Sequence, residues 1–241
     1  MPEPLLKLGG VHTHIGRYHI LHGVDLEIPE GRLTMLLGRN GAGKTTTLRT
    51  IMGLWRASAG EITFAGVPIT SDETPEIARR GIAYVPETMG IFTQLTVREN
   101  MVLATRTGRF DQGHLDRVFD LFPILRDKWN SQAGSLSGGQ KQMLAISRAI
   151  IEDRRLLIVD EPTKGLAPVI IEHLIDGFRR LKESRTTILL VEQNFHMARS
   201  LGDDVAVMDD GRIVHAGRMS DLAADERLQE RLLGLSLASH Q

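Results

Sequence analysis

The sequence predicts an α/β fold in which a mostly parallel β-sheet is covered on both faces. Short, almost wholly apolar runs such as Leu33–Leu37 and Leu156–Asp160 end on glycine-rich or acidic segments. Runs of this kind are typical of buried parallel strands, because both faces of such a strand pack against other elements. Helical stretches precede the later runs, and this alternation is the pattern of βαβ units. The 241 residues suffice for one large domain with a sizeable core.

The first part of the chain predicts β-structure. Residues 5–37 alternate or run apolar in short pieces, and Glu61–Ile69 has the pattern of a hairpin. Between them, the segment TTTLRTIMGL after Lys44 predicts a helix that stops at Gly53. Gly81–Val85 predicts another buried strand.

The pattern of apolar residues changes in residues 88–148, which we predict to be a mostly helical insert. Thr96 and Glu99 have the spacing of a capping box, in which each side chain bonds the other residue's backbone N–H at a helix start. Helical periodicity follows in residues 100–105 and again in 115–125.

The last third of the chain returns to strands. Leu156–Asp160 and Thr186–Val191 predict two of them, each after a helical stretch. Val205–Met208 and Arg212–His215 predict two more, joined by a tight turn with Gly211 at the position that requires a positive φ.

We therefore expect one domain over residues 1–241, with 1–87 and 149–241 forming its core. Residues 225–235 predict a terminal helix, and the tail 236–241 is expected to be frayed.

The composition excludes several classes of protein. Hydrophobic residues make up 41% and charged residues 24%, which is ordinary for a globular protein. The absence of cysteine excludes disulfides and thiolate metal sites, and the net charge of -1 gives no support for a nucleic-acid partner. There is no signal-peptide pattern, and no apolar stretch approaches the ~20 residues that cross a bilayer. We expect a cytoplasmic protein that could serve a membrane only as a peripheral subunit.

The segment GRNGAGKTT fits the phosphate-binding pattern G-x-x-x-x-G-K-[ST]. Its glycines let backbone N–H groups turn inward around a phosphate, and the helix that follows points its positive end at the anion. Lys44 supplies a mobile positive charge, and Thr45 supplies a hydroxyl for Mg²⁺. An ordinary glycine-rich turn is the alternative, which the preceding strand and following helix disfavour. The residues expected to contact the nucleotide are Gly38, Arg39, Asn40, Gly41, Ala42, Gly43, Lys44, Thr45 and Thr46.

The apolar run LLIVDE ends in two carboxylates with separate expected roles. Asp160 can anchor Mg²⁺ or accept a hydrogen bond from Thr45. Glu161 lies one residue past the strand, where a carboxylate can act as the general base for an attacking water. The alternative is a solvated strand end, which the presence of Lys44 disfavours.

A second glycine motif, LSGGQ, contains Ser137, Gly138, Gly139 and Gln140. Ser-x-x-Gln is again a capping box, and the two glycines leave the helix N-terminus accessible to an anion. A simply capped helix is the structural alternative. Because the helical insert carries Ser137 away from Lys44, we expect a nucleotide to lie between the phosphate loop of one chain and the Ser137 helix of a second chain.

With these motifs in place, the chain resembles the ATP-binding cassette (ABC) ATPases. The segments that carry the resemblance are GRNGAGKTT, VPETMGIF, LSGGQ, LLIVDEPT and VEQN. The resemblance implies a phosphate-loop nucleotide-hydrolase fold with a RecA-like core sheet, an N-terminal antiparallel β subdomain and an inserted helical subdomain. Further segments, such as LTVREN and DEPTKGLAP, are similar to the ATPase subunits of bacterial high-affinity branched-chain amino acid importers.

The resemblance also implies cofactors and partners. ATP and Mg²⁺ would be bound, and ATP hydrolysis would energise uptake of branched-chain amino acids or a related small polar solute. The partners implied are a second ABC ATPase subunit (an identical copy or a sibling), transmembrane permease subunits and, indirectly, a periplasmic solute-binding protein, at the cytoplasmic face of the membrane. The alternative is a soluble ABC ATPase that acts on nucleic acid or ribosomes. One cassette, no sustained heptads and no net positive charge disfavour it.

Three residues depart from the commonest pattern of the wider family. Glu87 stands where most members have a glutamine near Mg²⁺ and the attacking water, and Gln193 stands where most have a histidine at the γ-phosphate. Ile15 stands where many place an aromatic residue against adenine. By resemblance, Gln193 and Glu87 are counted with the catalytic residues, Glu87 also with the metal ligands, and Ile15 with the nucleotide contacts. Neutral drift is the alternative for each.

The loop after Glu87 carries apolar residues at Met89, Ile91 and Phe92. Packing into the core is the default interpretation of such residues. The resemblance implies the alternative that this loop helps to form a groove for a short helix of a transmembrane subunit.

Overall fold

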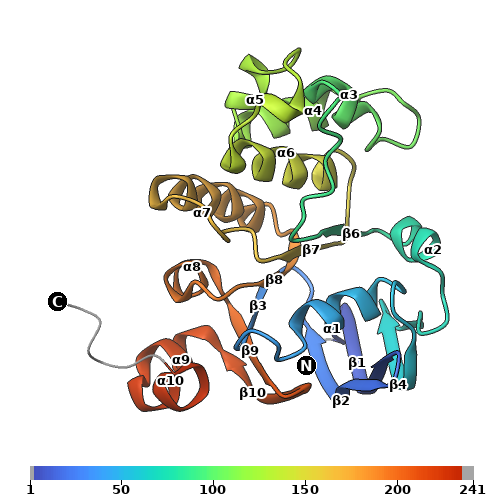
Figure 1. The fold of residues 1–241 in the computed structure, drawn as a ribbon, viewed down its shortest axis with the longest axis vertical. Helices are drawn as coiled ribbons and strands as arrows, with labels where there is room; N and C mark the ends of the chain where they lie inside the picture. Colours follow the sequence, from blue (N-terminus) through green and yellow to red (C-terminus); the bar gives the residue numbers. More distant parts are fainter. Residues whose placement is uncertain (1–2, 235–241) are drawn as a thin grey trace.

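The structure, a computed structural model, describes residues 3–234, so Leu235 and the expected frayed tail 236–241 lie outside it. Its strands form two sheets (Figure 1). The first sheet is antiparallel and has the order β2-β1-β4-β5. Its members are β1 (Leu6–Ile15), β2 (Tyr18–Ile28), β4 (Ala57–Phe64) and β5 (Val67–Pro68).

The second sheet has the order β10-β9-β3-β8-β7-β6, in which only the β9–β10 pair is antiparallel. Its members are β3 (Leu33–Leu37), β6 (Ile82–Val85), β7 (Leu156–Asp160), β8 (Thr187–Val191), β9 (Asp204–Asp209) and β10 (Arg212–Arg218). The predicted α/β class, with a mostly parallel core sheet and an antiparallel N-terminal sheet, is confirmed. Gly211 has a φ of 70° in the turn between β9 and β10, as expected.

Helices connect and cover these strands (Figure 1). They are α1 (Lys44–Ile51), α2 (Thr74–Arg79), α3 (Val97–Val102), α4 (Gln112–Leu121), α5 (Ile124–Asp127), α6 (Gly138–Ile150), α7 (Pro168–Glu183), α8 (Phe195–Leu201), α9 (Met219–Ala224) and α10 (Glu226–Leu233). A short 3₁₀ helix occupies Ala133–Ser135. Helices α3 to α6 gather at one end of the molecule, and the antiparallel sheet lies at the other. The boundaries predicted for the helical insert, 88 and 148, stay a prediction.

The central strands of the core sheet are mostly apolar because they separate two hydrophobic clusters. On β7, Leu157 and Val159 belong to the cluster under α6 and α7. Leu156 and Ile158 point the other way, into the cluster shared with α1 and the antiparallel sheet. Successive side chains of a strand alternate between faces, so a strand buried on both faces reads as a continuous apolar run.

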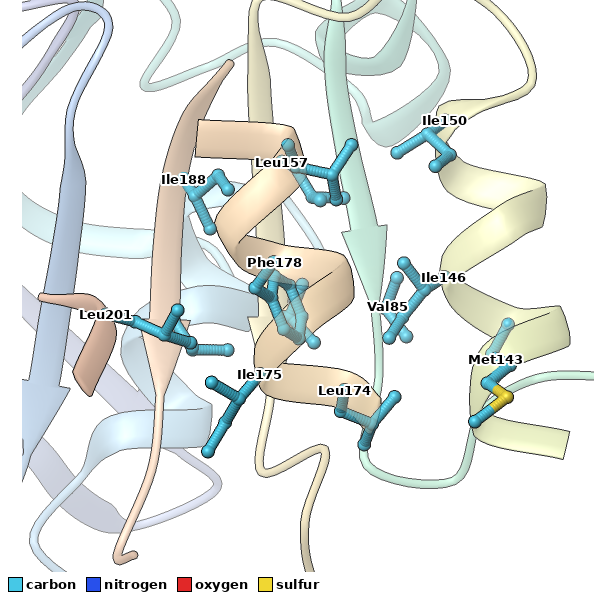
Figure 2. Packing of buried hydrophobic residues seen from close by; sticks show 14 of the residues in the cluster. Val85, Met143, Ile146, Ile150, Leu157, Leu174, Ile175, Phe178, Ile188 and Leu201 are labelled. Carbon is cyan, nitrogen blue, oxygen red and sulfur yellow. The ribbon is translucent and has the colours of Figure 1, made fainter. Parts of the chain in front are cut away.

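Helix α7 packs against the core sheet through one apolar stripe (Figure 2). Leu174, Ile175 and Phe178 lie on this stripe and are buried, as the three- and four-residue spacing of a helix face requires. Figure 2 shows Phe178 between the strand residues Leu157 and Ile188. The stripe fixes the segment that leads from β7 into α7, and this segment begins at the candidate site.

Two predicted helices differ from the structure. The single helix expected over residues 115–125 is divided, because α4 ends at Leu121 and α5 begins at Ile124. Pro123 explains the break: proline disfavours the helical conformation of the preceding residue, and Phe122 has a φ of -135° and a ψ of 76°. The terminal helix begins at Glu226, with Asp225 as its N-cap, and the short helix α9 before it was not predicted.

Across residues 3–234, the structure contains no helix with both the length and the apolar character that a membrane crossing demands.

Candidate functional site

The phosphate loop joins the end of β3 to the start of α1, as the motif predicts. Gly38 and Gly43 have φ values of 149° and 106°, which favour glycine. A Cβ atom on Gly38 would collide with the backbone carbonyl of Met208 in β9. The loop therefore lies close against the neighbouring strand, and only glycine permits that approach.

Lys44 is buried at the centre of this loop, with 4% of its surface exposed. Its Nζ donates to the carbonyl oxygens of Gly38 at 2.8 Å and Arg39 at 3.1 Å. No described side chain caps the first turn of α1, so its N-terminal N–H groups are available to an anion. A buried ammonium beside an uncapped helix N-terminus fits a nucleotide phosphate.

Asp160 is buried at the end of β7 and lies next to the phosphate loop. Its Oδ1 accepts from the Thr45 hydroxyl and its Oδ2 accepts from the Tyr84 hydroxyl, each at 3.3 Å. Burial raises the pKa of Asp160, the charges of Glu161 and Glu87 raise it further, and the two hydrogen bonds oppose the shift. Burial and the charge of Asp160 raise the pKa of Tyr84 to about 12. Hydroxyl and carboxylate oxygens are the ligands that Mg²⁺ prefers, so Thr45 and Asp160 fit this ion.

Glu161 follows Asp160 and takes a left-handed backbone conformation with a φ of 45°, which is uncommon for a residue with a side chain. Its carboxylate, only 9% exposed, lies 3.4 Å from Lys44 Nζ. It also accepts a 2.7 Å hydrogen bond from Gln193 Nε2, which donates to Asn40 Oδ1 at 2.7 Å. Residues from three distant segments thus meet at one carboxylate.

Glu192, next to Gln193, is a residue that the sequence analysis did not single out. It is 2% exposed and accepts from the backbone N–H of Thr163 at 3.0 Å, of Gln193 at 3.0 Å and of Asn194 at 3.1 Å. Burial raises the pKa of Glu192, and these hydrogen bonds oppose that shift. The carboxylate therefore joins the loop after Glu161 to the loop that carries Gln193. The position of Glu192 directly after an apolar strand is the feature of the sequence that could have marked it as a site residue.

Glu87 lies at the same edge of the sheet as Asp160 and Glu161. The pairing of β6 with β7 sets Val85 beside Val159, so Glu87 and Glu161 follow paired positions by two residues. Glu87 Oε1 lies 2.6 Å from the ammonium of Lys164, another residue that the sequence analysis did not consider.

Several of the residues described above line a cavity of about 330 Å³. It is lined by Ile20, Asn40, Gly41, Gly43, Lys44, Thr45, Thr46, Glu87, Glu161 and Lys164. Ile15, which was expected to contact the nucleotide, does not line the cavity, whereas Ile20, which was not predicted, does. Gly38, Arg39 and Gln193 line an adjoining cavity of about 370 Å³.

The second glycine motif lies in another part of the molecule. Ser137 caps α6 through the expected box, because its Oγ accepts from Gln140 N at 3.3 Å and its N–H donates to Gln140 Oε1 at 3.0 Å. Figure 1 shows α6 among the helices of the insert, away from α1. Gly138 is exposed, but Gly139 is buried, and a Cβ atom there would collide with Ile170 of α7. Gly139 is therefore required for packing as well as for an accessible helix start.

The comparisons with known proteins agree with this geometry. The family described as ABC transporter matches residues 21–164. The chain is 38% identical to the high-affinity branched-chain amino acid transport ATP-binding protein BraG of Pseudomonas aeruginosa, over 95% of this chain and 100% of that protein. It is 36% identical to the probable branched-chain amino acid transport ATP-binding protein LivF of Archaeoglobus fulgidus, over 90% and 93% of the two chains.

The fold has a close match among solved structures. The ADP conformation of MJ1267, an ATP-binding cassette of an ABC transporter, superimposes with a TM-score of 0.81 at 25% identity, over 96% of this chain and 99% of that one. The family match, the sequence relatives and this superposition together show that the chain belongs to the ABC transporter family, as one of its ATP-hydrolysing subunits.

Proposed function

We propose that this chain is the ATPase subunit of an importer for branched-chain amino acids or a related small polar solute. The observation that supports its catalytic part is the contact of the Glu161 carboxylate with Lys44 and Gln193, in which Lys44 and Glu161 line the 330 Å³ cavity. The solute class is inferred from what the relatives in Pseudomonas and Archaeoglobus are named for transporting.

The phosphate loop would bind the β- and γ-phosphates of ATP. Backbone N–H groups of the loop and the N-terminus of α1 would surround the anion, and Lys44 would transfer hydrogen bonds from the loop carbonyls to phosphate oxygens. Ile15 or Ile20 would cover the adenine ring. Ile20 lines the cavity, which favours it.

Thr45 and Asp160 would hold Mg²⁺, with Glu87 as a further oxygen ligand. When bound, the ion supplies positive charge that offsets the charge developing on the phosphates. Binding a cation at this position would also relieve the burial cost of the Asp160 carboxylate, which is expressed in its raised pKa.

Glu161 would accept the proton of the attacking water, while Gln193 orients that water and the Glu161 carboxylate. The hydrogen bond of Gln193 to Glu161 places the base and the orienting amide next to each other. An amide donates hydrogen bonds but does not carry a proton between groups, so the proton would go to Glu161 alone.

A second cassette would complete the site. Ser137 and Gly138 are exposed at the start of α6 and lie outside the residues that line the two cavities around this chain's own phosphate loop. They are therefore available to the nucleotide of another subunit, either an identical copy or a sibling. Closing the pair would exclude water and strengthen the charge contacts.

The permease surface would lie beside the loop after Glu87. Met89 and Ile91 are partly buried against the core, as the default interpretation has it, but Phe92 is 49% exposed. The buried Asn100 holds this loop, because its side chain exchanges two 2.9 Å hydrogen bonds with the backbone of Phe92. A firmly held loop with an exposed aromatic residue suits contact with a permease helix. This contact would lie at the cytoplasmic face of the membrane, and the permease would receive its solute from a periplasmic solute-binding protein.

The test of catalysis replaces Glu161 with glutamine. Glu161→Gln should retain ATP binding and lose phosphate release, by roughly 100-fold or more, since it removes the general base and keeps its shape. Glu183→Gln, at an exposed position on the last turn of α7, is the matched control and should behave as the unchanged protein. Near-normal phosphate release by Glu161→Gln would remove Glu161 from this role.

The test of transport supplies the permease in vesicles loaded with ATP. Uptake of labelled leucine that requires ATP and is lost in Glu161→Gln would support the proposal. Uptake of urea or an aromatic acid instead would keep the ATPase role and change the solute.

A further inference from the structure

Three carboxylates converge at one edge of the core sheet. Asp160 ends β7, Glu161 follows it directly, and the register of β6 against β7 brings Glu87 beside them. A triphosphate in this cavity would add more negative charge, so the site needs compensating cations.

Among the residues that line the 330 Å³ cavity, two carry positive charge, Lys44 and Lys164. Lys44 is buried and donates to two carbonyls of its own loop. Lys164 is different, because its side chain is 58% exposed and extends from the loop after Glu161 to Glu87. Its ammonium lies 2.6 Å from Glu87 Oε1 and 3.9 Å from Glu161 Oε2.

We propose that Lys164 is a positioning residue for ATP hydrolysis, whose ammonium holds Glu87 and thereby ties the loop 86–92 to the loop 161–167. This inference rests on the ATPase function proposed above. Glu87 is the chain's departure from the commoner glutamine, and a cation next to it removes the excess charge that this departure introduces.

The ion pair joins two functional segments. One is the loop that carries Phe92 and leads into helices α3 to α6. The other begins at Glu161 and is anchored by the hydrogen bond that Thr163 N donates to the Glu192 carboxylate. A displacement of the first loop would therefore be transmitted through Lys164 to the segment that carries the candidate base. Because both partners are partly exposed, the pair is screened and can separate.

The test is a double-mutant cycle on phosphate release. Lys164→Met keeps the aliphatic stem and removes the charge, and Glu87→Gln removes the other partner. Lys164→Met should lower kcat roughly threefold to tenfold when Glu87 is present. In the Glu87→Gln background the same change should alter kcat by less than about twofold, because the tie is already broken.

Nucleotide binding gives the second readout. The Kd of a fluorescent ATP analogue, measured with Glu161→Gln as the parent, should rise on loss of the Lys164 charge in both backgrounds, and added salt should reduce that rise. A split between a background-dependent kcat and a background-independent Kd is the signature of positioning as distinct from simple charge.

Lys7→Met is the matched control. Lys7 forms an ion pair with Glu27 at 3.0 Å, of similar exposure, in the antiparallel sheet outside the cavity. It should change neither kcat nor Kd. Equal fold-changes in kcat from Lys164→Met in both backgrounds, or changes no larger than those of Lys7→Met, would overturn the inference. Normal turnover by Glu161→Gln would instead overturn the proposed catalytic role, so the two failures are distinguishable.

Discussion

Removal of the Glu192 carboxylate is expected to destabilise the protein and slow ATP hydrolysis together. Glu192→Ala leaves the N–H groups of Thr163, Gln193 and Asn194 without their acceptor. An unsatisfied buried donor costs about 1–3 kcal/mol, so three of them would cost about 3–9 kcal/mol. Relief from burying a carboxylate, whose pKa is raised, offsets part of this cost. We expect a net loss of about 2–4 kcal/mol, since the loops can relax toward water.

Glu192→Gln separates the contributions. Its amide oxygen can accept hydrogen bonds, but its NH₂ group cannot, so the bond to Thr163 or the bonds to Gln193 and Asn194 must be lost. We expect this variant to lose about half as much stability as Glu192→Ala. In both variants kcat should fall at least severalfold, because the loops that place Glu161 and Gln193 would no longer be joined.

The assays are thermal unfolding without nucleotide and phosphate release at saturating ATP. For a chain of this size, each kcal/mol corresponds to about 2–4 °C in Tm, so Glu192→Ala should lower Tm by about 4–16 °C. Glu183→Ala, at the exposed end of α7, controls for loss of an ordinary glutamate. A Tm within 1–2 °C of the parent together with unchanged kcat would show that the carboxylate does not join the two loops.

The remaining predictions concern the glycine motif and Asp160. Gly139→Ala should cost about 1–3 kcal/mol because its Cβ would collide with Ile170, whereas Gly138→Ala, whose Cβ would meet Leu166 at an ordinary 3.5 Å, should fold with a nearly unchanged Tm. Equal melting temperatures for the two variants would contradict this packing role. Asp160→Asn should raise the Tm of the nucleotide-free protein and abolish turnover, since it removes a buried charge and keeps the shape. The folded-state pKa of Asp160 lies above its ordinary 3.8, so this carboxyl costs stability as pH rises through that range. The Tm advantage of Asp160→Asn should accordingly vanish near pH 4 and grow toward neutral pH, and a constant advantage from pH 4 to 8 would refute that cause.

Local patterns were sufficient to predict much of the fold and part of the site. The core strand at Leu156–Asp160 was predicted with its observed bounds, because a strand buried on both faces is a continuous apolar run, here ended by an acidic residue. The Thr96 and Ser137 capping boxes form as expected, since their hydrogen bonds span only three residues. The single helix expected over residues 115–125 is wrong because Pro123 interrupts the helix despite the apolar periodicity on both sides of it.

The parts of the site that escaped prediction depend on contacts between distant segments. Glu192 accepts from Thr163, 29 residues away, and Lys164 meets Glu87, 77 residues away. Neither glutamate has a short-range pattern that names its partner. Ile20 was not predicted for a similar reason, since the alternation within β2 does not show that Ile20 lines the same cavity as the phosphate loop.

The sequence by itself determined the strands, the phosphate loop and the chemistry that Lys44, Asp160 and Glu161 can perform, because these depend on neighbours along the chain. Only the tertiary structure decided which side chains lie next to Asp160 and Glu161. Two strand registers made that decision: Val85 beside Val159 brings Glu87 to the acidic edge, and Asp160 beside Val191 brings Gln193 to Glu161. Hydrogen bonds between parallel strands set these registers, and the sequence of a single strand does not specify its partner.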